Sequence, residues 1–184
     1  MLDTHYHLDM YSKPPSVAHT AAEHGAFIIA MANLPSHFQQ GLTHVRDLKG
    51  VRLALGLHPL VAEHHAEEQK LFGQLLPLTS SVGEVGLDFS REGKQTKNRQ
   101  LQTFPHVIEL VSHSAKVISL HSRGAESEVI NVLEEYGIRR AIFHWYTGPL
   151  SLLKDALAAG HYFSVNPSMS LSKKGQENNC GRSR

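Results

Sequence analysis

The sequence predicts an α/β fold built from repeated units of one β-strand followed by one α-helix. Short runs rich in Val, Ile and Phe alternate with longer segments of helical periodicity, and that alternation is typical of such units. The strand-like runs recur about every 26 residues, which fits either a doubly wound parallel sheet or a (β/α)8 barrel. Seven runs are present, and an eighth strand would centre at about residue 190, beyond the 184 residues of this sequence.

The individual elements follow from the local residue pattern. Ser16 is the expected N-cap of a first helix that ends at Gly25, and Gly137 and Gly160 stand where two later helices are expected to end. The strands are expected at Leu2–His7, Phe27–Met31, Val51–Leu57, Ser81–Leu87, Lys116–His121, Arg140–His144 and His161–Asn166.

The segment Lys97–Ser114 predicts an amphipathic helix. Leu101, Phe104, Ile108 and Val111 recur at spacings of three and four residues, so they should form one apolar stripe on that helix. Helices of this kind connect and cover the strands of a parallel sheet.

The composition indicates a single folded domain and excludes several classes of protein. The chain has 18 Lys and Arg against 17 Asp and Glu, 41% hydrophobic residues and one Cys, so neither general disorder nor a disulfide framework is expected. No apolar run is long enough for a membrane span and no signal pattern opens the chain, so a cytoplasmic protein without a membrane partner is expected. The near-neutral net charge argues against a broad basic surface that binds nucleic acid, although not against a small local one. The 14 histidines need a specific explanation.

Residues able to bind metals stand at or near the C-terminal ends of five of the expected strands. His5 and His7 end the first strand, and their imidazoles project together because residues two apart in a strand point to the same face. Glu84 lies inside the otherwise apolar fourth strand, where a carboxylate is costly to bury unless it is paired or bound to a metal. The third, fifth and sixth strands end at or just before His58, His121 and His144. In parallel sheets and barrels these ends build the functional site.

This set of side chains predicts a two-metal centre. Four histidines and one carboxylate exceed what one tetrahedral zinc needs, so Glu84 is expected to bridge two ions between which the histidines divide. Mixed imidazole and carboxylate ligation favours zinc, manganese or iron over magnesium. Such a centre activates a water molecule for hydrolysis. The histidines on helices and loops, His65 among them, are expected to be merely solvated or packed.

Five motifs in order resemble those of the TatD-type metal-dependent deoxyribonucleases, a family of the amidohydrolase superfamily. The resemblance runs from residue 2 to about Gln176. Within it, the amino-acid sequences of Ile118–Arg123 and Tyr162–Met169 are most similar to those of the TatD-like nuclease of Qat anti-phage defence systems. The motifs are Asp-Thr-His-x-His-Leu-Asp at 3–9, Gly-Leu-His-Pro at 56–59, Glu-Val-Gly-Leu-Asp at 84–88, His-Ser-Arg at 121–123 and His-Trp-Tyr-Thr-Gly at 144–148.

The resemblance implies a TIM (β/α)8-type barrel and a role for each site residue. His5 and His7 would bind the first metal, Glu84 would bridge as the central catalytic group, and His121 and His144 would bind the second metal. The resemblance also places His58 near the substrate phosphate. Arg123 and Trp145 could contact a phosphate or stack on a base, but Arg123 could equally form a surface ion pair and Trp145 could belong to the core. Asp88 could orient a metal ligand from behind or cap the loop that follows it. The implied reaction is hydrolysis of phosphodiester bonds in DNA, from single-stranded or 3′ ends, with two divalent ions (zinc, manganese or magnesium).

The family completes its site with an aspartate after the eighth strand, and no Asp follows Asp155 here. We therefore expect an incomplete barrel over residues 1–176 that lacks its eighth strand, followed by an aberrant polar tail over 177–184. Such a truncated or frameshifted form should bind the first metal more weakly and have reduced or absent activity unless a partner supplies the missing edge.

Two other functions remain open from the sequence. The chain could be an inactive subunit that binds nucleic acid or protein partners in a defence complex, which the absent aspartate favours. It could also be an amidohydrolase that acts on an amide, a lactone or a phosphotriester. Related barrels of that kind often carry a bridging carboxylated lysine, and no Lys stands at the end of the fourth strand.

Overall fold

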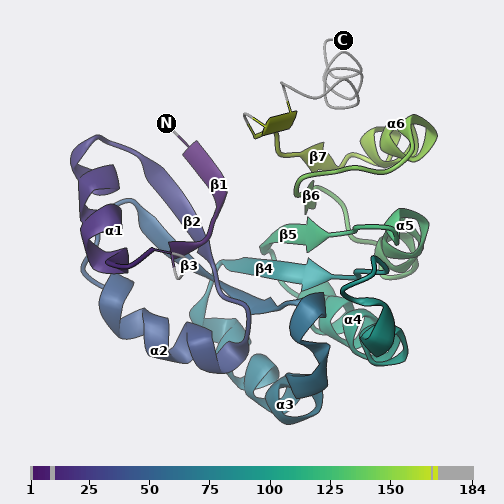
Figure 1. The fold of residues 1–184 in the computed structure, drawn as a ribbon, viewed down its shortest axis with the longest axis horizontal. Helices are drawn as coiled ribbons and strands as arrows, with labels where there is room; N and C mark the ends of the chain where they lie inside the picture. Colours follow the sequence, from purple (N-terminus) through teal and green to yellow (C-terminus); the bar gives the residue numbers. More distant parts are fainter. Residues whose placement is uncertain (1, 9–10, 167, 170–184) are drawn as a thin grey trace.

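A computed structural model describes residues 2–8, 11–166 and 168–169, and these form one curled, seven-stranded sheet with all neighbouring strands parallel (Figure 1). The strands are β1 (Leu2–Tyr6), β2 (Phe27–Met31), β3 (Val51–Leu57), β4 (Ser81–Gly86), β5 (Val117–His121), β6 (Ile142–Phe143) and β7 (Tyr162–Phe163). They are arranged in chain order, which is the order in the wall of a (β/α)8 barrel and not that of a doubly wound sheet. The α/β prediction is confirmed, and a strand joining β7 to β1 is not among the described residues.

A helix follows each of the first six strands and lies on the outer side of the curled sheet (Figure 1). The α-helices are α1 (Pro14–Glu23), α2 (Pro35–Val45), α3 (His65–Leu75), α4 (Lys97–Ser112), α5 (Glu126–Glu135) and α6 (Leu150–Ala158). Short 3-10 helices are η2 (Pro59–His64), η3 (Leu76–Leu78) and η4 (Lys94–Thr96). Within the described part of the chain, no helix has both the length and the apolar character that crossing a membrane requires. The predicted polar tail at 177–184 lies outside the described residues.

All seven predicted strands are present, but the sixth and the seventh, expected at Arg140–His144 and His161–Asn166, have only two residues each. The sixth expected strand is shortened because Arg140 has a φ of 61°, a left-handed conformation that no strand residue adopts. The predicted cap at Ser16 is wrong: α1 begins at Pro14, where the fixed φ of proline suits the first helical turn, and Lys13 precedes it without a side-chain cap. The predicted helix ends are confirmed, with Gly137 and Gly160 in the left-handed conformation just past α5 and α6.

The apolar stripe predicted on α4 is only partly correct. Phe104, Ile108 and Val111 are buried, but Leu101 is 38% exposed. Gln100 takes the buried position instead and is fully inaccessible, because its amide makes hydrogen bonds to the loop that precedes the helix. A polar network has thus set the rotation of the first turn of this helix.

The main hydrophobic core lies between the sheet and helices α2 to α6, and it includes Phe72, Leu120 and Leu133, all fully buried. A smaller core, which contains Ala18 and Ile28, joins α1 to the first strands. Two polar side chains, Glu84 and Ser119, are nevertheless buried in the middle of the strands. They belong to the group described next.

Candidate metal centre

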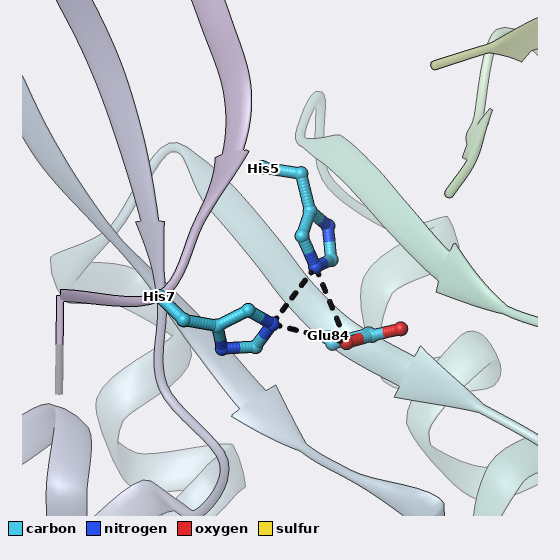
Figure 2. A group of neighbouring side chains, drawn as sticks. All are labelled: His5, His7 and Glu84. Carbon is cyan, nitrogen blue, oxygen red and sulfur yellow. Dashed lines mark hydrogen bonds and ion pairs between the residues drawn. The ribbon is translucent and has the colours of Figure 1, made fainter. Parts of the chain in front are cut away.

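The carboxylate of Glu84 on β4 lies among four imidazoles that come from the ends of three other strands. The Oε2 atom is 3.3 Å from His5 Nε2, 3.7 Å from His7 Nε2 and 3.2 Å from His58 Nε2, and the Oε1 atom is 2.7 Å from His121 Nδ1. Figure 2 shows that the rings of His5 and His7 reach the same end of the carboxylate, from β1 and the residue after it. The structure therefore brings together residues that are up to 116 positions apart in the chain.

Glu84 is ionised in this setting. Burial of a side chain that is only 4% exposed opposes ionisation, but hydrogen bonds from His121, His5, His58 and His7 outweigh it and hold the pKa of Glu84 well below its usual range. A buried negative charge of this kind is stabilised by cations or by donors placed around it. The geometry favours the binding of positive charge at this point.

Asp88, just after β4, holds the far side of His121. The His121 ring lies between two carboxylates, with Nε2 at 2.7 Å from Asp88 Oδ2 and Nδ1 at 2.7 Å from Glu84 Oε1. Burial alone would lower the pKa of His121, but its bonds to Asp88 and Glu84 raise it to about 9. Burial would raise the pKa of Asp88, and the bonds from His121 and Ser90 lower it to about 2. The orientation of His121 is thus fixed from both sides.

His144, just after β6, stacks on His5, with ring centroids 3.3 Å apart and planes 7° from parallel. Burial, and then the nearby His5, lower the pKa of His144 to about 3. A serine hydroxyl lies beside Nδ1 of each ring, with Ser119 Oγ at 2.8 Å from His5 and Ser164 Oγ at 3.0 Å from His144. The Ser119 contact leaves the Nε2 atom of His5 facing Glu84, where a metal could bind.

The donor atoms form two groups that fit divalent metal ions. His5, His7 and Glu84 form the first, and His58, Glu84 and His121 form the second, with the ligand atoms of each group within 4.8 Å of one another. Glu84 belongs to both, as a bridging carboxylate in a two-metal site would. Imidazole nitrogens with one carboxylate are a donor set that zinc and similar ions accept. We expected His144 to be the second histidine of this second group. Among the described residues, His58 holds that position instead.

The two expected substrate contacts beyond the metal groups lie at the rim of the centre. Arg123 is two residues past His121, and its exposed guanidinium is 3.6 Å from Glu92. Trp145 follows His144, is 53% exposed and has a left-handed φ of 41°. Neither side chain is placed against Glu84 by any described contact.

Three residues of this site were not found from the sequence. Ser119 could have been, because it lies two positions before His121 on the same strand and therefore points to the same face. Ser164 follows β7, where no pattern marks it. His65 is fully buried, with Nε2 3.0 Å from the carbonyl of His58 and Nδ1 2.8 Å from Thr103 Oγ1, so it supports the loop that carries His58.

Comparison with known proteins identifies the family that the sequence of this chain matches. A family model described as "TatD related DNase" matches residues 2–181. The deoxyribonuclease TATDN3 of Homo sapiens is 28% identical over 158 residues, which cover 77% of this chain and 57% of that protein. The 3′-5′ ssDNA/RNA exonuclease TatD of Erwinia amylovora is 30% identical over 127 residues, covering 66% of this chain and 49% of that protein.

The fold has a counterpart among solved structures. The TatD homologue YjjV of Escherichia coli K12 superimposes with a TM-score of 0.85 at 23% identity, over 97% of this chain and 73% of that one. The chain spans only about half to three fifths of the length of the curated human and Erwinia relatives, at 57% and 49%.

Proposed function

Because the chain belongs to the family of TatD related DNases, we propose that it carries the metal centre of a hydrolase that cleaves phosphodiester bonds in DNA. The observation that supports this most directly is the buried carboxylate of Glu84 surrounded by four imidazoles. Scattered structural histidines would not converge on one carboxylate from three separate strands.

The residues of the chain would divide the work around this centre. His5 and His7 would hold one divalent ion and Glu84 would bridge to a second, held by His121 with His144 or His58. Divalent ions at such a site lower the pKa of water and polarise the phosphate that is attacked. Asp88 would keep the His121 ring in the ligating orientation, because it fixes the nitrogen that faces away from Glu84. Zinc, manganese and magnesium are the candidate ions, and the imidazole-rich donor set suits the first two best.

The substrate is proposed to be DNA with a single-stranded or 3′ end. The Erwinia relative is named a 3′-5′ ssDNA/RNA exonuclease, which supports this choice. Arg123 would contact a phosphate and the exposed Trp145 would stack on a base, since both lie beside residues of the centre. His58, which contacts Glu84, would also lie near the reacting phosphate.

A place in anti-phage defence is the narrower form of this proposal. It rests on the amino-acid sequence of the segments Ile118–Arg123 and Tyr162–Met169, and it implies protein partners of a defence complex. Co-expression with candidate partners from the same gene cluster, followed by purification of the tagged chain, would detect such a complex.

The test compares metal content and hydrolysis in two glutamate variants. Glu84→Ala should lose bound metal and the hydrolysis of both bis(4-nitrophenyl) phosphate and end-labelled single-stranded DNA, because it removes the group shared by both ligand sets. Glu109→Ala, at an exposed position of α4, should behave as the unchanged protein. Equal metal content in Glu84→Ala and the unchanged protein would refute the centre, and hydrolysis of a lactone or amide panel without any cleavage of DNA would refute the substrate.

A further inference from the structure

We propose that four cations beside the metal centre bind the phosphates of one nucleic-acid strand and lead it to Glu84. The basic rim, as we name it, consists of Arg91, Lys94, Lys97 and Arg123. Arg91 lies in the loop after β4, Lys94 begins η4, Lys97 begins α4, and Arg123 lies in the loop after β5. The proposal rests on the function proposed above and specifies where the part of the strand that does not react is held.

The two loops that carry the rim are joined to each other. The amide of Phe89 donates a hydrogen bond of 2.9 Å to the carbonyl of Arg123. Across the same junction, the guanidinium of Arg123 is 3.6 Å from the carboxylate of Glu92. Lys97 Nζ lies 4.0 Å from the centroid of the Phe89 ring, so this cation is also placed against the β4 loop.

The loop that carries the rim is fixed by buried contacts. The buried amide of Gln100 accepts from the backbone of Asp88 at 2.7 Å and donates to the carbonyl of Gly93 at 2.9 Å. A side chain at Gly93 would meet the Asp88 carbonyl oxygen at 2.2 Å, so the loop closes on itself at a contact that only glycine allows. A loop held in this way is already arranged before a ligand binds, which lowers the entropy cost of binding.

Asp88 connects the rim to the metal centre. One of its oxygens accepts from the amide of Ser90, at the start of the loop, and the other contacts His121 at 2.7 Å. The rim therefore has a defined position relative to His121 and Glu84. A strand bound on the rim would be presented to the centre in one register.

The charge around the centre is asymmetric. The loop over residues 89–97 contains Arg91, Lys94 and Lys97 against the single acid Glu92. The corresponding segment after β3, residues 59–68, has three glutamates and neither Lys nor Arg. Because the whole chain has a net charge of only +1, this is a local concentration of charge and not a general property of the surface. A polyanion would approach from the β4 and β5 side.

The rim residues are available to a ligand. Arg91, Lys94 and Lys97 are exposed, and the Arg123–Glu92 pair is exposed on both sides, so a phosphate can compete for the guanidinium at little cost. Trp145, on the next loop round the sheet, adds an exposed aromatic ring. Cations that follow a backbone together with a ring for stacking are the features of single-strand binding, since the bases of a duplex are not free to stack.

The experiment measures binding of a fluorescein-labelled 12-mer of deoxythymidylate to the full chain in EDTA, so that no cleavage occurs. Lys94→Ser/Lys97→Ser should weaken binding about tenfold at low salt and reduce the slope of log K against log salt by about 1.4, because each lost contact to a single-strand phosphate removes about 0.7. The matched control, Arg46→Ser/Lys49→Ser, removes the same charge from exposed residues that precede β3, at the opposite end of the sheet. This control should bind as the unchanged protein.

Trp145 supplies a second readout, because it is the only tryptophan in the sequence. Its fluorescence should be quenched by the 12-mer and not by an abasic strand of the same length, which has the phosphates without the bases. Equal loss of affinity in the two double variants, or tighter binding of duplex than of single strand, would overturn the proposal.

Failure of this proposal and failure of the proposed function would look different. The substrate bis(4-nitrophenyl) phosphate has a single phosphate and is too small to contact the rim while it reacts at the metal centre. Both double variants should therefore hydrolyse it at the metal-dependent rate of the unchanged protein. If that rate is present and the rim variants bind normally, only the rim is wrong. If no protein hydrolyses the small diester, the function is wrong.

Discussion

Single side chains determine whether this site forms, and Glu84 is the most demanding of them. A carboxylate buried at 4% exposure is tolerated only because four imidazoles surround it. The imidazoles in turn need fixed orientations, and several have an identifiable partner that supplies one. The hydroxyl of Ser119 on His5 is the clearest case, since it reaches across the inside of the sheet from β5 to β1.

Ser119→Ala should weaken metal binding by about 10- to 100-fold, the effect usual for groups that orient a ligand. The His5 ring would lose the contact that leaves Nε2 facing Glu84. Titration of the metal-free protein with zinc or manganese measures this, and Ser127→Ala, exposed on α5, is the control. Unchanged affinity in Ser119→Ala would contradict the orienting role.

The metal-free protein should be most stable at about pH 6.5. Burial lowers the pKa of His65, His144 and His161, so below about pH 6.5 the unfolded chain binds more protons at these rings than the folded chain does, and stability falls as the pH drops. The raised pKa of His121, about 9, contributes stability that is complete below pH 6.5 and is lost as the pH rises toward 9.

Urea unfolding in EDTA at pH 5.5, 6.5 and 8.5 measures how stability falls on the acidic and on the alkaline side of the maximum. The free energy of unfolding should be highest at the middle value, and His121→Gln should flatten the alkaline limb. A steady increase from pH 5.5 to pH 8.5 would show that the His121 contacts do not stabilise the folded chain.

At the scale of the element, α4 shows how far local sequence determines structure. Its length was predicted to within two residues, because the periodicity of Phe104, Ile108 and Val111 is strong. The exposure of Leu101 was not predicted, because the rotation of the first turn depends on Gln100 and on a loop whose conformation leaves no periodic signal. The cap of α1 failed for a similar reason, since Pro14 competes with Ser16 for the start of the helix.

Gln100→Ala should reduce the free energy of unfolding by about 1–3 kcal/mol, because it leaves buried backbone groups of the β4 loop without partners. It should also weaken binding of the 12-mer, since the basic rim is carried by that loop. Gln95→Ala, exposed in the same loop region, is the control for both measurements. Normal stability in Gln100→Ala would mean that the loop is held by other contacts.

At the scale of the whole molecule, the regular spacing of the strands was sufficient to predict the α/β fold. The choice between a doubly wound sheet and a barrel wall was not available from spacing alone, because it depends on which strands pair. The convergence of His5, His58, Glu84 and His121 could be anticipated from the order of the strands. The three histidines lie at or next to strand ends that meet at one edge, and Glu84 lies inside the strand between those of His58 and His121. The sequence could not predict that His58 and not His144 would lie in the second ligand group, because this depends on how the rings pack inside the sheet, where His144 stacks on His5.

The core should tolerate little loss of volume. Leu133→Ala, at a fully buried position of α5, should cost about 2–5 kcal/mol of stability through the cavity that it leaves. Leu78→Ala, at a position 62% exposed, should stay within about 0.5 kcal/mol of the unchanged protein. Urea unfolding of both variants measures the difference, and equal effects would contradict the assignment of the core.

The arrangement around Glu84 has a consequence for assembly of the chain. Its four imidazoles come from β1, β3 and β5 or from the residues that follow them, so no contiguous stretch of the polypeptide contains a complete ligand set. An ion can be captured only after strands distant in sequence have found their neighbours, and once captured it opposes their separation. Chelation should therefore loosen the first strand well before it melts α5, and residue-resolved amide exchange would record that order.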